Sequence, residues 1–271
     1  MFRATDSFGR SIPSLTEADF EIHENGTEVK NFKIIGSNSV ADSEVDIVFT
    51  LDITGSMDEE INAIKLAIRG FVSQLASRRV KARLCVVTFK DEVVDRCRRF
   101  VEDDPTTTKN ENLDWFEDFL TRLDPEGGDL PKENSLGGLV TAIEETPWGA
   151  NRQRVVILFT DIAFWIQPLD YKEREARFAP TYDRVMSAVQ GGQAMVFPVT
   201  PKMNAFATDY FSKPSIPKMS NGQWFDLRKL EKGQTTMDEI FTKIGQKIET
   251  NYALEYIVED SPGLDPSLPL S

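Results

Sequence analysis

Three apolar runs rich in β-branched residues, separated by helix-like sequence, dominate the middle of this chain. They are residues 45–52 (VDIVFTLD), 152–162 (RQRVVILFTDI) and 193–200 (QAMVFPVT). None alternates polar and apolar residues throughout, so each is predicted to be a strand covered on both faces. Strands that alternate with helices build a mostly parallel sheet with helices on both sides. We therefore predict a doubly wound α/β domain over about residues 43–251.

Helical periodicity marks the segments between and after these runs. Two long segments place apolar residues three or four positions apart, as in amphipathic helices that bury one face. Shorter helices are predicted at ENLDWFEDFLTRL (111–123) and NSLGGLVTAIEE (134–145). The apolar positions of the two long helices are Ile61, Ile64, Ile68, Phe71 and Leu75 in the first, and Met237, Ile240, Ile244 and Ile248 in the second.

The two ends of the chain show a different pattern. Residues 19–35 alternate polar and apolar side chains around Asn25-Gly26, a dipeptide typical of two-residue β-hairpins. Near the other end, YALEYIV (252–258) predicts one more strand. So few strands do not form a stable sandwich alone. We expect the segments 1–42 and 252–271 to pair as a small, partial β-domain into which the α/β domain is inserted.

The charge of the chain limits its partners. The formal net charge is −13, which disfavours nucleic acid and anionic membrane surfaces and favours cations. No apolar run reaches the roughly 18 residues of a membrane-spanning helix. The first residues, MFRATDSFGRS, show no signal-peptide pattern.

Two cysteines flank a predicted hairpin with strands near 82–89 and 93–99. If Phe89 lies opposite Val93, Cys85 comes to lie opposite Cys97, within reach of a cross-strand disulfide. The alternative is a pair of free, half-buried thiols. The sequence leaves both open.

Polar residues stand where several predicted elements reach one edge of the sheet. In a doubly wound sheet, ligands bind outside the carboxyl ends of the strands. One group follows the first strand, one lies in the loop GGDLP, and one follows the second strand. The candidate site residues are Asp52, Thr54, Ser56, Asp129 and Asp161.

Helix capping offers a simpler explanation for part of this pattern. Ser56 or Asp58 could cap the following helix, because both residue types accept hydrogen bonds from the first helical N–H groups. Capping leaves the three other aspartates unexplained. Carboxylates about 4 Å apart repel by about 4 kcal/mol per pair at an effective dielectric constant of about 20. A divalent ion would remove this cost, and carboxylate and hydroxyl oxygens suit Mg²⁺, with Mn²⁺ or Ca²⁺ as alternatives.

These motifs resemble those of a von Willebrand factor A domain. DITGSM after a buried strand, GGDLP in the middle and ILFTD later occur in the family's order and on its elements. The family's metal-ion-dependent adhesion site is written D-x-S-x-S, then a distant threonine or acidic residue, then a distant aspartate. The resemblance implies that the ion is held by Asp52, Thr54, Ser56, Asp129 and Asp161, with threonine replacing the commoner serine at position 54.

The resemblance also implies a function. The expected function is non-enzymatic, metal-dependent protein binding, in which a partner's acidic side chain completes the coordination of the ion. Asp129 stands where many family members have threonine. Three ionised aspartates around a doubly charged ion should bind that ion more tightly and attract an acidic partner less.

Two other functions stay open. The ion could be purely structural in a spacer domain of a larger surface protein. Alternatively, Asp52 could be the nucleophile of a Mg²⁺-dependent hydrolase. Phosphatases of that kind need a second aspartate where this chain has Thr54, and no Walker or G-x-S-x-G motif is present. We therefore expect that the protein is not an enzyme.

The segment before the α/β domain resembles the Ig-like β-segment that precedes such domains in bacterial secreted proteins. This resemblance implies an extracellular, periplasmic or cell-surface location.

Overall fold

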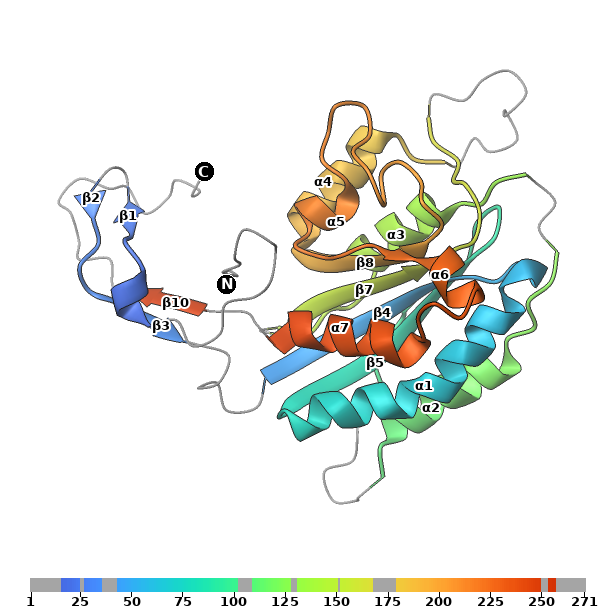
Figure 1. The fold of residues 1–271 in the computed structure, drawn as a ribbon, viewed down its shortest axis with the longest axis horizontal. Helices are drawn as coiled ribbons and strands as arrows, with labels where there is room; N and C mark the ends of the chain where they lie inside the picture. Colours follow the sequence, from blue (N-terminus) through green and yellow to red (C-terminus); the bar gives the residue numbers. More distant parts are fainter. Residues whose placement is uncertain are drawn as a thin grey trace. The chain divides into compact units, whose positions relative to one another are not determined.

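The computed structural model describes residues 16–24, 27–35, 43–101, 109–127, 131–150, 152–167, 179–249 and 253–256 (Figure 1). The chain divides into two compact units. One is formed by Asp42–Gln246, and the other by Met1–Ala41 together with Lys247–Ser271.

The larger unit contains a six-stranded sheet with the order β6-β5-β4-β7-β8-β9. Neighbouring strands are parallel except at one edge, where β6 runs antiparallel to β5. The central strand β4 pairs with β5 over its whole length and with β7 on its other side. This sheet confirms the predicted α/β fold. The strands are β4 (Ser43–Asp52), β5 (Val80–Phe89), β6 (Val93–Asp95), β7 (Gln153–Phe159), β8 (Ala194–Thr200) and β9 (Phe225–Asp226).

Helices cover both faces of the sheet (Figure 1). On one face, Phe49 of β4 contacts Phe116 of α2 and Phe241 of α7, and Phe241 stacks on Phe71 of α1. On the other face, α3 packs against β4, β5 and β7, and α4 packs beside α3. The helices are α1 (Asp58–Ser77), α2 (Glu111–Arg122), α3 (Ser135–Glu144), α4 (Tyr182–Gly192), α5 (Ile216–Met219), α6 (Leu227–Glu231) and α7 (Met237–Glu249).

The amphipathic patterns correctly predicted the buried faces of α1 and α7. All nine apolar positions named for the two long helices are buried. The small residues of α3 let that helix approach the sheet closely. A Cβ atom at Gly138 would lie 2.7 Å from Cδ1 of Phe89 and 3.2 Å from Cγ2 of Thr50.

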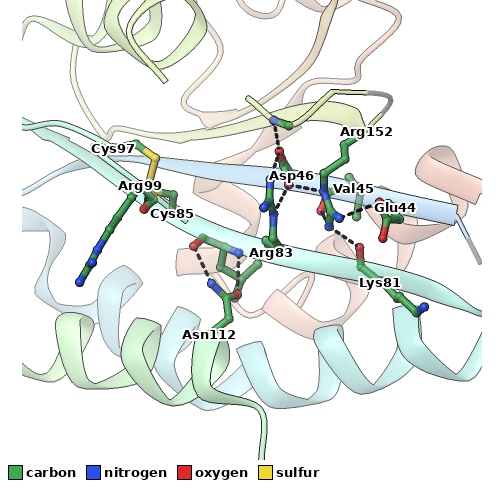
Figure 2. A network of polar contacts seen from close by, with 12 residues as sticks. Glu44, Val45, Asp46, Lys81, Arg83, Cys85, Cys97, Arg99, Asn112 and Arg152 are labelled. Atoms are coloured by element: carbon green, nitrogen blue, oxygen red, sulfur yellow. Dashed lines mark hydrogen bonds and ion pairs between the residues drawn. A yellow bond between two sulfur atoms is a disulfide. The ribbon is translucent and has the colours of Figure 1, made fainter. Parts of the chain in front are cut away.

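A buried ion-pair network joins the amino-terminal part of the sheet (Figure 2). Asp46 of β4 is fully buried, and Arg83 of β5 donates to both of its carboxylate oxygens at 2.8 Å. Arg152, just before β7, donates to Oδ1 at 2.6 Å, and the Gly149 N–H donates to Oδ2 at 2.8 Å. Two guanidinium groups therefore compensate this one buried carboxylate and fix the start of three strands.

A disulfide joins Cys85 of β5 to Cys97, with 5.7 Å between the two Cα atoms (Figure 2). Both cysteines are buried. Phe89 pairs with Val93 as the sequence analysis required, but the register then shifts by one residue, so that Thr88 pairs with Asp95. Of the two alternatives that the sequence left open, the bridged one is observed.

The smaller unit contains two antiparallel strand pairs. Strand β3 (Phe32–Ile35) pairs with β10 (Ala253–Tyr256), so the two ends of the chain meet in one ladder. Strands β1 (His23–Glu24) and β2 (Thr27–Glu28) pair around Asn25-Gly26, a dipeptide outside the described residues. A short 3₁₀ helix spans Glu17–Asp19. In the described part of the chain, no helix is long and apolar enough to cross a membrane.

Candidate metal site

Asp52 is the last residue of β4, at the carboxyl edge of the sheet, and it is fully buried. Oδ1 accepts hydrogen bonds from the Thr54 N–H at 3.0 Å and from the Thr54 hydroxyl at 2.7 Å. Oδ2 accepts from the hydroxyl of Thr160, just beyond β7, at 2.7 Å. All three donors are neutral. The carboxylate is thus fixed in orientation without a compensating charge from these contacts.

The pKa of Asp52 is raised above its ordinary value, and burial is the main cause. The hydrogen bonds from Thr160 and Thr54 act in the opposite direction because they stabilise the ionised form. The negative charge of Asp161 raises the pKa further.

The hydroxyl groups of Thr54 and Ser56 face each other, with 3.4 Å between their oxygen atoms. Ser56 lies in a 3₁₀ turn, Gly55–Met57, that leads directly into α1. The N-cap residue of α1 is Met57, which makes no side-chain capping bond. The capping explanation for Ser56 or Asp58 is therefore wrong, since the helix does not use either side chain in that way.

Asp161 lies two residues beyond β7 and is half-buried. Its Oδ1 atom is buried without a hydrogen-bond partner. Its backbone oxygen accepts a hydrogen bond from Nη2 of Arg228, the second residue of α6, at 3.4 Å. Asp161 thus presents an uncompensated oxygen at the same sheet edge as Asp52.

Asp129, the remaining candidate, lies outside the described residues. Gly127 of the same loop is described and has φ +71°, a conformation that glycine adopts without strain. Across the described ranges, no three carboxylate, histidine or cysteine side chains form a group that could hold a metal ion. The described part of the candidate site is therefore two carboxylates, Asp52 and Asp161, with the hydroxyl groups of Thr54 and Ser56.

Sequence reasoning missed Glu133, just before α3. Its N–H donates to the Ala163 carbonyl at 2.9 Å, and its carbonyl accepts from the Trp165 N–H at 3.0 Å. These bonds hold the loop before α3 against the segment that follows Asp161. The Glu133 side chain is only 3% exposed, and its Oε2 atom has no hydrogen-bond partner in the described structure.

The pKa of Glu133 is raised from 4.5 to about 8. Burial is the largest cause, followed by the negative charges of Asp52, Asp91 and Asp161, while Lys90 lowers the pKa slightly. Glu133 thus shares its electrostatic environment with both described carboxylates of the candidate site. A single glutamate in a loop rich in glycine and proline gives no sequence signal of burial, and only the tertiary fold reveals it.

Trp165 contacts the same loop. Its side chain is 3% exposed, and its indole N–H donates to the Lys132 carbonyl at 2.7 Å. Nζ of Lys132 lies 4.8 Å from the centre of the ring.

Comparison with curated proteins finds no match for this chain. A family model does match part of it, and the matched span contains all five candidate residues. It begins at Asp46 in β4 and ends just after β7, so it covers the two central strands that carry Asp52 and Asp161. Residues 46–163 of this chain match the family model of the von Willebrand factor A domain.

Proposed function

We propose that the α/β domain is a non-enzymatic, divalent-cation-dependent protein-binding module. The match to the von Willebrand factor A domain supports this proposal, because domains of that family generally mediate protein interactions and often depend on a metal. Mg²⁺ is the proposed ion, with Mn²⁺ or Ca²⁺ as alternatives. The proposed ligands are Asp52, Thr54, Ser56, Asp161 and, from outside the described residues, Asp129.

The observation that carries the proposal is the fully buried carboxylate of Asp52. Its hydrogen-bond donors are the neutral groups of Thr54 and Thr160, and its charged neighbour Asp161 is also negative. An ionised carboxylate loses much of its hydration when buried, and a cation in contact with it offsets that cost.

Three other carboxylate oxygens near this edge support the same conclusion. Oε2 of Glu60, Oε2 of Glu133 and Oδ1 of Asp161 are buried and accept no hydrogen bond from the described residues. When such a group is ionised, its oxygens only accept hydrogen bonds and need a donor, a water molecule or a cation, whereas a proton satisfies the group when it is neutral. Carboxylate and hydroxyl oxygens together are the donor set that Mg²⁺ prefers.

Each residue has a defined part in this proposal. Asp52 and Asp161 supply negative charge, and Thr54 and Ser56 supply neutral oxygens close to Asp52. Thr160 holds the second oxygen of Asp52 in place. A bound ion would add a concentrated positive charge with coordination positions that a partner protein can fill.

Calorimetry and thermal unfolding test the ion site. Mg²⁺ at about 100 times its Kd should stabilise the fold by about 2.7 kcal/mol. For a domain of this size that free energy corresponds to a Tm rise of about 5–10 °C. The Asp52→Asn variant should lose the heat of Mg²⁺ binding and the Tm rise. Its Tm in chelator should not fall, because the substitution removes an uncompensated buried charge.

The exposed variant Asp118→Asn on α2 is the matched control and should respond to Mg²⁺ like the unmodified protein. Equal Tm values for the unmodified protein in chelator and in saturating Mg²⁺ would count against the ion site. The hydrolase alternative is checked on the same samples with a generic phosphate ester. Mg²⁺-dependent turnover that disappears in Asp52→Asn would support the hydrolase alternative against the proposed binding function.

We also propose that the domain works outside the cytoplasm. The Cys85–Cys97 disulfide supports this location, because such bonds persist mainly in oxidising compartments. Thiol titration of the protein unfolded without reductant, after expression in the periplasm and in the cytoplasm, is the test. A bridge that forms equally well in both compartments would remove this support.

A further inference from the structure

Exposed carboxylates border the candidate metal site on the side of α1. Asp58 and Glu59 open that helix directly after the Gly55–Met57 turn, and both are exposed. Glu126 comes from the loop after α2, and its N–H donates to the Ile53 carbonyl at 3.2 Å. This bond holds an exposed acidic residue of a distant segment next to the Asp52–Ser56 segment.

A further carboxylate borders the site on the side of α6. Glu231 accepts hydrogen bonds from Nη1 of Arg228 at 2.8 and 2.9 Å, while Nη2 of the same side chain contacts the Asp161 carbonyl. The guanidinium group is therefore engaged by α6 itself and by the loop after β7. We call Asp58, Glu59, Glu126 and Glu231 the acidic rim.

Glu60 gives the rim a second, independent feature. Its side chain is 93% buried, since its exposed fraction is 7%, and its Oε2 atom has no partner in the described part of the chain. Burial raises the pKa of Glu60, and the negative charges of Glu231, Asp161 and Glu59 raise it further. An acceptor without a donor thus lies at the base of the acidic rim.

We propose that the acidic rim docks a basic segment of the partner protein, one that presents lysine or arginine side chains around the ion site. The inference rests on the proposed protein-binding function and specifies the partner. Opposite charges across an interface speed association and reject wrongly charged partners. The net charge of −13 acts in the same direction at long range. A partner segment rich in carboxylates would be repelled before it reached the ion.

Two synthetic peptides of equal length, one of ten lysines and one of ten glutamates, are the probes. Fluorescence anisotropy would measure their binding to the whole Mg²⁺-loaded protein at low and at physiological salt. The lysine peptide should bind, with an affinity that falls as salt rises, and the glutamate peptide should not. Binding of the glutamate peptide in preference to the lysine peptide would overturn the proposal.

Charge reversal tests whether the rim is the docking surface. The double variant Glu59→Lys/Glu126→Lys should weaken binding of the lysine peptide at least tenfold. The control is Glu111→Lys/Asp114→Lys, which changes the net charge equally and also alters exposed residues in the first turn of a helix. Asp114 pairs with Arg69, so the Tm of this variant is measured to verify that it is folded. That turn lies beside the amino-terminal half of β5, because neighbouring Asn112 bonds to the backbone of Leu84 (Figure 2). Equal weakening by both variants would refute a rim-specific surface.

Mg²⁺ affinity, measured by calorimetry on the same variants, separates this inference from the proposed function. The rim variant should bind Mg²⁺ more weakly, because lysines beside the ion site repel the cation. Peptide binding is therefore compared at Mg²⁺ concentrations that calorimetry shows to saturate each variant. Absence of Mg²⁺ binding in the unmodified protein would refute the ion site alone. Lysine-peptide binding that the rim substitutions leave unchanged, in a protein that still binds Mg²⁺, would refute the rim alone.

Discussion

We predict that the free energy of unfolding depends on pH through the carboxyl group of Glu133. In the folded protein its pKa is about 8, whereas the unfolded chain releases this proton near pH 4.5. Between these two values the folded state binds more protons than the unfolded state, so the free energy of unfolding falls as pH rises. The contribution of this carboxyl group to stability is fully present below about pH 4.5 and is lost by about pH 8. At about 1.4 kcal/mol for each tenfold change in proton affinity, the loss amounts to about 5 kcal/mol.

The Glu133→Gln variant isolates this effect, because glutamine has nearly the same shape and cannot ionise. Both proteins are unfolded thermally in chelator from pH 5 to 8.5. The Tm of the variant should rise relative to that of the unmodified protein as pH increases, by about 8–15 °C over the range, because about 4 kcal/mol of the loss falls between pH 5 and 8.5. The exposed variant Glu126→Gln is the control and should follow the unmodified protein.

Saturating Mg²⁺ adds a second readout. A cation near Glu133 stabilises its ionised form, so the loss of stability at high pH should be smaller with Mg²⁺ than with chelator. Parallel Tm curves for the unmodified protein and Glu133→Gln in chelator would refute the argument. They would mean that burial and the neighbouring aspartates do not hold a proton on this carboxyl group.

Three further substitutions test the structure around the sheet. Asp46→Asn should destabilise the fold by about 3–5 kcal/mol in denaturant unfolding, because Arg83 would lose its buried anion and Arg152 would keep only its ion pair with Glu44. Replacing Cys85 and Cys97 together by serine should cost about 2–4 kcal/mol in the same assay, since the unfolded chain gains freedom. Thr160→Val should weaken Mg²⁺ binding by about 10–100-fold in calorimetry, whereas Thr160→Ser should bind normally, because only serine keeps the hydroxyl that orients Asp52. An unchanged result in any of these assays would contradict the corresponding contact.

The fold could be predicted from the sequence because its strongest signals are local and periodic. β4, β7 and β8 are continuous apolar runs, and the buried stripes of α1 and α7 repeat every three or four residues. The elements that were not predicted are too short for any period. β9 has two residues, and α5 and α6 have four and five. These short elements are defined by tertiary contacts, not by their own sequence.

The candidate site could be predicted only in part, for a similar reason. Asp52 and Asp161 follow strands of a parallel sheet, so the fold class alone brings them to one edge. Thr54 and Ser56 follow in the same loop. Glu133 could not be recognised, because its burial depends on backbone bonds to the segment 163–165, about 30 residues away in the chain. Such a long-range contact cannot be inferred from the residues next to Glu133 in the sequence.

Two aspartates on strand β4 differ in how the fold compensates their charge. Asp46 and Asp52 are six residues apart, so their side chains leave the same face of the strand, and both are fully buried. At Asp46 the protein supplies two guanidinium groups and one N–H, which compensate the charge internally. At Asp52 the donors in the described part of the chain are neutral, and further carboxylates lie nearby. This contrast between the two ends of one strand is what motivates the proposed cation at Asp52.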